Sequence, residues 1–288
     1  MTIDPAKIDS IPPYSEVIDF TTEQARLYAL AVGAGSDPMD EDDLAYVDPS
    51  RPLKVLPSMA VVLCPQVTPT FNYLDIKHPE LMLHAEQRLT IFKPLKPSCK
   101  MVIDDKIVAV YDRGSERGAV IEYQINGRYE GDGDLCFTTI MVSAARGDGG
   151  FGGTPPDPTK KAYPIPEREP EVTLECATRP EQALWYSLTG DLNPIHISPT
   201  IAKKVGFDRP ILQGLCSYGM ICRVLIQYFA GGDSERLRQY DVRFSAPVTP
   251  GDTLQISAWF EDTNCVVFRV TSATSGQKLL DNGYCIFS

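Results

Sequence analysis

The residues best suited to chemistry lie in DLNPIH, residues 191–196. Asp191 and His196 are five positions apart, and the Asn193-Pro194 pair between them is typical of a capped turn. A turn allows both side chains to converge on one point, whereas an extended strand does not. A carboxylate and an imidazole at one site suit a reaction that takes a proton from water and delivers one to carbon. We therefore predict an acid–base pair at this turn.

A third candidate is Gly214, which stands directly before the apolar segment 215–229. As the start of a predicted helix it offers an unencumbered backbone N–H, where the helix dipole favours an anion such as a developing oxyanion. Each candidate also has an ordinary structural interpretation: His196 as a surface or capping residue, Asp191 as a turn former, Gly214 as a packing glycine. Their occurrence together favours the chemical interpretation.

Other kinds of site find less support in the sequence. His78 and His84 have no cysteine pair nearby, so a zinc site is not predicted. No Gly-x-Gly-x-x-Gly follows a strand-like run, and no nucleophile elbow surrounds a serine or cysteine. We interpret the glycine-rich RGDGGFGG, residues 146–153, as a flexible joint rather than a phosphate loop. We expect neither a metal ion nor a separate cofactor.

Two helical segments resemble each other and suggest a duplication. Thr21 and Gln24 have the spacing of a capping box, which predicts a helix that ends at Gly33. The segment EQALWYSLTG, residues 181–190, matches EQARLYAL, residues 23–30, at five of eight positions with a constant offset of 158 (181 − 23). The second segment therefore predicts an equivalent helix.

Strand-like runs follow the helical segment in each half of the chain. They are residues 88–92, 100–112, 119–125 and 135–144, then 240–248, 253–261, 265–272 and 279–288. The run 215–229 has an apolar face too broad for a surface helix. The glycine- and proline-rich stretch 146–170 predicts a linker with a boundary near residue 160. We expect an α+β fold in two halves, 1–160 and 161–288, each with a long buried helix against an antiparallel sheet.

The composition sets limits on partners and location. A net charge of −11 and a pI of about 4.8 argue against general affinity for nucleic acid or anionic membranes. The eight scattered cysteines favour reduced, buried thiols and an intracellular protein. We find no pattern of a signal peptide or membrane span. The location expected is cytoplasmic or peroxisomal, although IFS at 286–288 is not a Ser-Lys-Leu address.

The motifs resemble the hydratase 2 motif of the MaoC-like enoyl-CoA hydratases, including the hydratase unit of the peroxisomal multifunctional enzymes of type 2. The resemblance rests on YSLTGDLNPIH (186–196), PILQGL (210–215) and VRFSAPVTPGDTL (242–254), and extends to LHAEQRLTIFKPL (83–95) and RGDGGFGG. It implies a double hot-dog fold, two hot-dog repeats that each wrap a sheet around a long helix. It also implies reversible conversion of trans-2-enoyl-CoA to (3R)-hydroxyacyl-CoA in fatty-acid β-oxidation. We expect an acyl-CoA substrate and a homodimer.

The resemblance also assigns roles to residues. Asp191 and His196 match the catalytic pair, Asn193 helps to hold them, and Gly214 supplies the oxyanion contact. The expected substrate and coenzyme A contacts are His84, Ala85, Arg113 and Phe244. After its helix the first half has only GAGSDPMD, residues 33–40, so one active site per chain is expected, with the first half shaped to accept the acyl chain.

Two residues depart from the family pattern, and both leave the acyl group open. Gln213 stands where the family usually has histidine, and Ala85 stands where it has glycine. Two alternatives to a fatty-acyl hydratase therefore stay open. One is a biosynthetic dehydratase that acts on a specialised acyl thioester. The other is a non-catalytic thioester-binding protein, against which the presence of both Asp191 and His196 counts.

Overall fold

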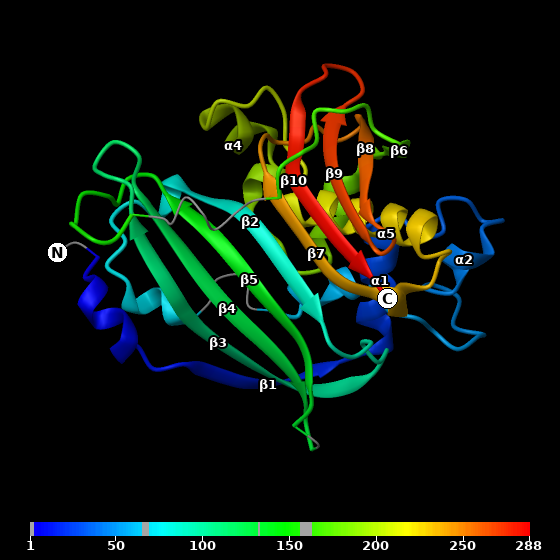
Figure 1. The fold of residues 1–288 in the computed structure, drawn as a ribbon, viewed down its shortest axis with the longest axis horizontal. Coiled ribbons are helices and arrows are strands. Elements are labelled where there is room, and N and C mark those ends of the chain that lie inside the picture. Colours follow the sequence, from blue (N-terminus) through cyan, green and yellow to red (C-terminus); the bar gives the residue numbers. More distant parts are fainter. Residues whose placement is uncertain (1–2, 65–68, 132, 156–162) are drawn as a thin grey trace.

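The computed structural model describes residues 3–64, 69–131, 133–155 and 163–288, and these form one ten-stranded antiparallel sheet. Figure 1 shows the first-half strands on the left and the second-half strands on the right. The strands are β1 (Tyr14–Phe20), β2 (Met82–Ile91), β3 (Cys99–Asp112), β4 (Ala119–Tyr129), β5 (Leu135–Ala145), β6 (Val172–Ala177), β7 (Leu237–Phe244), β8 (Thr253–Asp262), β9 (Cys265–Ser272) and β10 (Lys278–Phe287).

The strand order shows that the two halves have the same topology. The first half has the order β1-β3-β4-β5-β2, and the second has the corresponding order β6-β8-β9-β10-β7. β2 pairs with β7, so the two five-stranded units join into one continuous sheet. The predicted α+β double hot-dog fold is confirmed. Each of the eight predicted strand runs overlaps a strand, although the run 240–248 continues four residues past the end of β7, and β1 and β6 had no prediction.

The repeated helical segments form α1 (Thr22–Ala31) and α3 (Gln182–Ser187), which contact each other. The matched tyrosines Tyr28 and Tyr186 meet edge to face, with ring centroids 6.3 Å apart. Thr21 and Gln24 form the predicted capping box. Gln182 repeats half of it, because its Oε1 accepts a hydrogen bond from the N–H of Arg179 at 3.2 Å. The sequence repeat is therefore also a structural one.

The long buried helix is α5 (Gly214–Phe229), and it packs closely on α1. An added Cβ at Gly219 would lie 2.4 Å from the Tyr28 hydroxyl oxygen and 2.7 Å from Val32 Cγ1. Only a residue without a side chain fits this crossing. The face of α5 that includes Gly219, Tyr218 and Ile221 is fully buried, which places the helix in the main core.

The expectation of a long helix in each half is wrong for the first half. Where the second half has the long helix α5, the described residues of the first half have only the five-residue 3-10 helix η2 (Pro57–Val61). Prolines at 52, 57, 65 and 69 leave no proline-free run longer than seven residues, and proline disrupts a helix interior. η2 is entirely buried and contacts α5.

The predicted boundary near residue 160 lies in 156–162, outside the described residues, and stays a prediction. The glycine-rich stretch before it is not the expected flexible joint. Asp112 Oδ1 accepts hydrogen bonds from the N–H groups of Gly114 and Gly150, both at 2.8 Å, and Oδ2 accepts one from Gly152 at 2.7 Å. These hydrogen bonds lower the pKa of Asp112, and the one from the Gly150 N–H has the largest effect. The N–H groups of Gly150 and Gly152 thus attach the glycine-rich stretch to the end of β3.

The junction between the halves contains a buried acid, Asp241 on β7, which is 7% exposed. Burial raises its pKa to about 6 from an ordinary value of 3.8. The folded state therefore binds this proton more tightly than the unfolded state, so the contribution to stability is full below pH 4 and is lost as pH rises through 6. Ionised Asp241 costs up to about 3 kcal/mol.

We expect Asp241→Asn to be more stable than the wild type at pH 8, and the advantage to disappear at pH 4. The amide retains an acceptor for the Leu89 N–H, which bonds to Asp241 Oδ1 at 3.3 Å, but carries no charge. Urea unfolding of both proteins across this pH range measures the difference. Two parallel stability curves would show that Asp241 does not titrate differently in the folded state.

Candidate active site

Asp191 and His196 lie on opposite sides of a tight turn at the surface of the second half. Asp191 follows α3, and His196 ends the 3-10 helix η5 (Pro194–His196). The distance from His196 Nε2 to Asp191 Oδ2 is 3.9 Å, and the two side chains are 12% and 21% exposed. The turn thus brings both groups to one point, as the spacing predicted. A single water molecule can be held by both groups at this separation.

Asn193 connects the two members of the pair through short hydrogen bonds. Its N–H donates to Asp191 Oδ1 at 3.2 Å, and its carbonyl oxygen accepts from the His196 N–H at 3.1 Å. Its side-chain oxygen caps η5 by accepting from the N–H of Ile195 at 3.2 Å. Pro194, the first residue of η5, fixes the backbone for the helical turn. The local sequence alone therefore creates this geometry.

The imidazole of His196 is oriented by a backbone carbonyl. Its Nδ1 lies 2.8 Å from the oxygen of Ile211. A carbonyl can only accept, so Nδ1 carries the proton and donates it. In the neutral ring Nε2 then presents its lone pair toward Asp191. This arrangement makes Nε2 the atom that can accept a proton from water at the site.

Ile211, whose carbonyl orients His196, lies three residues before Gly214, the predicted oxyanion contact. Gly214 is the exposed first residue of α5, so its N–H has no partner within the helix. Phe244 packs against it: a Cβ added at Gly214 would lie 3.3 Å from the Phe244 ring. The Phe244 ring in turn meets His84 edge to face, with centroids 4.9 Å apart. His84, Phe244 and Gly214 therefore form one cluster.

Residue 85 lies in a β-bulge next to this cluster. On β2 the pairing with β5 shifts between His84 and Glu86, so Ala85 is the extra residue. His84 Nε2 lies 3.1 Å from the carbonyl oxygen of Glu86, to which it donates. Burial lowers the pKa of His84 to about 4, so the ring is neutral near pH 7 and can donate hydrogen bonds without carrying charge.

Arg113 lies in the loop that joins β3 to β4, apart from the cluster. Asp112, Ala119, Ala145 and Met82 stand side by side across four strands, which places Arg113 at the same end of the sheet as His84. Among the described residues no hydrogen bond or ion pair connects Arg113 to the acid–base pair. Its role in binding coenzyme A stays a prediction, as do the roles of the other site residues.

Sequence reasoning connected Gln213 only with the open question of the acyl group, whereas in the structure its side chain is part of the framework. Its side chain is fully buried and its Nε2 donates to the Ala183 carbonyl at 3.0 Å. This bond ties the start of α5 to α3, the helix that leads to Asp191. The Ile211 carbonyl was also missed, because a backbone acceptor leaves no signal in the sequence.

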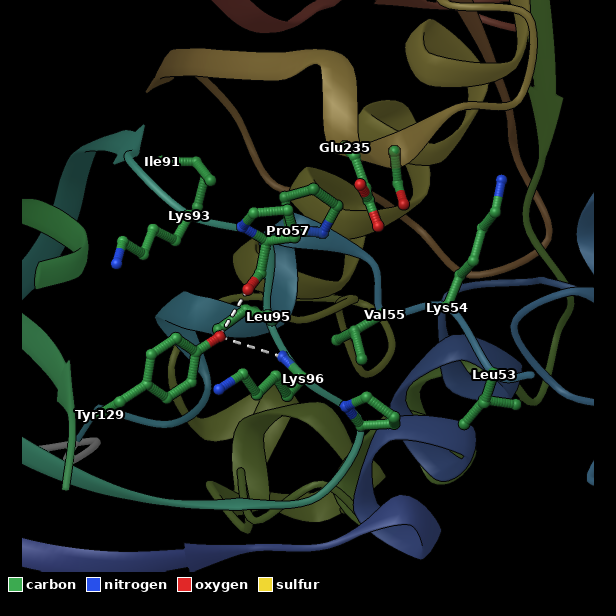
Figure 2. A pocket seen from close by; sticks show the side chains of 13 residues that line it. Leu53, Lys54, Val55, Pro57, Ile91, Lys93, Leu95, Lys96, Tyr129 and Glu235 are labelled. Atoms are coloured by element: carbon green, nitrogen blue, oxygen red, sulfur yellow. Dashed lines mark hydrogen bonds between the residues drawn. The ribbon is translucent and has the colours of Figure 1, made fainter. Parts of the chain in front are cut away.

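Of two cavities in the structure, one includes His84 of this cluster and the other lies away from it. A small one of about 50 Å³ lies between the first-half sheet and the start of α5, lined by Val61, Cys64, His84, Gln87, Ile125, Thr139, Met141 and Leu215. A larger one of about 440 Å³ lies near the other end of β2 and is shown in Figure 2.

The larger cavity contains neither member of the predicted acid–base pair, although lysines, Tyr129 and Glu235 line it. Figure 2 shows Lys54 and Lys93 extending from opposite walls, while Lys96 lies 4.3 Å above the Tyr129 ring. Lys93 is already paired with Asp134. The smaller cavity is not lined by Asp191 or His196 either, but it contains His84 and Leu215, the residue that follows Gly214.

The described residues contain no group of three or more His, Cys, Asp or Glu side chains arranged to hold a metal ion. All eight cysteines are free and six are buried, as predicted. No helix within the described ranges is long and apolar enough to cross a membrane.

Comparison with known proteins identifies the family. Residues 161–282 match the MaoC like domain, and residues 18–147 match the MFE-2 hydratase 2 N-terminal domain. The chain belongs to the MaoC-like family. The 3-hydroxyacyl-thioester dehydratase Y of Mycobacterium tuberculosis is 33% identical over 98% of both chains. The peroxisomal enoyl-CoA hydratase 2 of Arabidopsis thaliana is 32% identical over 92% of this chain and 89% of its own.

A solved relative supports the same assignment. The MaoC-like dehydratase from Phytophthora capsici has a TM-score of 0.88 and 32% identity, and the match covers 99% of both chains. The MaoC-like relatives are named as hydratases or dehydratases, so the family places this chain among the hydro-lyases. The predicted family and enzyme class are confirmed.

For this MaoC-like chain we expect Gly214→Ala and Gly219→Ala to fail in different ways. The first pushes the Phe244 ring by a few tenths of an ångström beside the predicted oxyanion position, so turnover of an enoyl thioester should fall roughly tenfold with little change in Tm. The second forces α1 and α5 apart and should cost about 1–3 kcal/mol of stability. Thermal unfolding and steady-state assays separate the two effects. Equal losses of stability would contradict the assignment of Gly214 to the site.

Proposed function

We propose that this protein catalyses the reversible hydration of trans-2-enoyl-CoA to (3R)-hydroxyacyl-CoA, with Asp191 and His196 as its acid–base pair. The observation that carries the proposal is the pair itself: two titratable side chains 3.9 Å apart, with the tautomer of His196 set by Ile211. The names of the relatives, enoyl-CoA hydratase and hydroxyacyl-thioester dehydratase, support the same reaction class.

The proposed chemistry follows from the positions of the groups. A water molecule held by Asp191 Oδ2 and His196 Nε2 attacks C3 of the enoyl group while Nε2 takes one of its protons. Electrons move to the thioester oxygen, where the Gly214 N–H and the start of α5 stabilise the negative charge. The imidazolium then returns the proton to C2. Water is added overall, and neither enzyme group is changed at the end.

We propose that the first half of the chain supplies much of the substrate-binding surface. His84 and Phe244 flank Gly214, and the adjoining cavity extends under the first-half sheet, where we place the start of the acyl chain. Arg113 is proposed to contact coenzyme A at the same end of the sheet. The dehydratase direction uses the same groups in reverse. A homodimer and a cytoplasmic or peroxisomal location stay predictions.

We expect Asp191→Asn and His196→Gln each to reduce turnover of crotonyl-CoA by about 10²–10⁴-fold while the fold stays intact. Both variants remove a proton acceptor and leave the size of the side chain nearly unchanged. Loss of the enoyl thioester absorbance measures turnover, and circular dichroism checks the fold. Near-normal turnover by either variant would exclude it from the acid–base pair and would favour a thioester-binding protein.

We expect the product to be a single enantiomer formed by syn addition. Asp191 and His196 come from one turn and face the same side of the bound chain, so water and proton must arrive on one face. Hydration of crotonyl-CoA, with the product offered separately to (3R)- and (3S)-specific dehydrogenases, identifies the alcohol. Oxidation by the (3S)-specific enzyme, or equally by both, would overturn the proposed geometry.

A further inference from the structure

The larger cavity, of about 440 Å³, has no role in the proposed chemistry. The first half supplies most of its lining, from the segment 53–57, from the end of β2 with the loop after it, and from the end of β4. The 3-10 helix η6 (Ser234–Arg236) of the second half completes it. The volume lies in the range of about 300–1,000 Å³ that is typical of ligand pockets. The cavity is therefore large enough for a small organic molecule.

The buried part of the lining is apolar. Its side chains are Val55, Pro57, Ile91, Leu95 and Tyr129. The Tyr129 hydroxyl is already paired, because it donates to the Pro94 carbonyl and accepts from the Lys96 N–H at 3.2 Å (Figure 2). A ligand group that lies against this wall finds no free polar partner there, so that group should be apolar.

The exposed part of the lining is mostly positive. Its charged side chains are Glu235, Lys54, Lys93 and Lys96. Lys93 is paired with Asp134, whereas the Lys96 ammonium lies 4.3 Å from the centre of the Tyr129 ring. Within the described part of the chain, no carboxylate forms an ion pair with Lys54 or Lys96. Two lysines are therefore available to a ligand at the opening of the cavity.

This positive opening contrasts with the net charge of the chain, which is −11. Lys54 and Lys93 extend from opposite walls, as Figure 2 shows, so an anion at the opening meets positive charge from two sides. A cation at the same place is repelled. An apolar wall and a positive opening together fit a ligand with an apolar body and one anionic end.

We propose that this cavity binds an aliphatic carboxylate, with the chain against the buried wall and the carboxylate at the lysine-lined opening. A group with a single negative charge fits best, because Lys93 is already paired and Glu235 repels an anion with two charges more strongly. Ile91 at this cavity and His84 are seven residues apart on β2, or about 20 Å. The proposed site is thus separate from the acid–base pair and does not depend on the proposed function.

The first test is isothermal titration calorimetry of the wild type with butanoate, hexanoate and octanoate. Each added CH₂ should tighten binding roughly fourfold until the apolar wall is covered. Inorganic phosphate, which has no apolar body, should bind roughly tenfold or more weakly than octanoate. Phosphate binding as tight as that of octanoate, or an affinity that does not depend on chain length, would overturn the proposal.

The second test changes the charges at the opening and measures octanoate affinity. Lys54→Met and Lys96→Met should each weaken binding by about two- to fivefold, and Glu235→Gln should strengthen it by a similar factor. Damage to the cavity lowers affinity, so a gain in Glu235→Gln reports the charge alone. Octan-1-ol has the same chain without a charge, and its affinity should stay unchanged in all three variants.

The matched control is Lys106→Met, which removes an exposed lysine on β3 that does not line the cavity. It should leave octanoate affinity unchanged, and Lys54→Arg, which keeps the charge, should retain the wild-type affinity. Tm checks the fold of each variant. Weakening by Lys106→Met equal to that by Lys54→Met would reveal only the net charge. Octanoate binding that none of the three charge variants at the opening alters would place the ligand elsewhere. Either result would refute the assignment of this cavity.

Discussion

The pairing of β2 with β7 is the constraint on which the rest of the structure depends. Glu86 stands opposite Arg243 in this pairing, so His84 from the first half and Phe244 from the second come into contact. Neither half alone contains both rings. The continuous sheet also fixes where α5 begins relative to β2. Gly214 therefore lies beside the small cavity, whose walls come mainly from the first half.

The two halves of the duplicated sheet have diverged in what covers them. α5 covers the sheet of the second half, and Gly219 lets this helix approach α1 closely enough to contact Tyr28. In the first half, prolines prevent an equivalent helix and short 3-10 turns cover the sheet instead. Such turns pack less continuously than a helix of sixteen residues. We attribute to this difference the cavity beside His84.

The proposed acid–base pair depends on few residues. A local turn places Asp191 and His196, and one carbonyl from residue 211 sets the ring orientation. Gln213, buried and bonded to Ala183, connects this segment to α3. Within the described part of the chain its Oε1 has no hydrogen-bond partner, which is energetically costly for a buried amide. The family's usual histidine would introduce a titratable group directly next to the oxyanion position.

The sequence by itself determined the features that depend on neighbouring residues. Capping residues at Thr21 and Asn193 predicted two helix starts, and strand-like runs predicted eight of the strands. The site turn was predictable for the same reason, since the contacts of Asp191, Asn193 and His196 span only five residues. The resemblance of whole motifs supplied the family and the fold.

Only the tertiary structure decided what depends on residues far apart in the chain. The Ile211 carbonyl that orients His196 is a backbone group, and any residue at that position provides one. The contact of His84 with Phe244 joins segments 160 positions apart through strand pairing. Burial of Asp105 and Asp241 likewise follows from which strands are neighbours, and an acidic residue in a strand pattern gives no sign of it. Burial and long-range pairing are properties of the assembled sheet, and no local pattern records them.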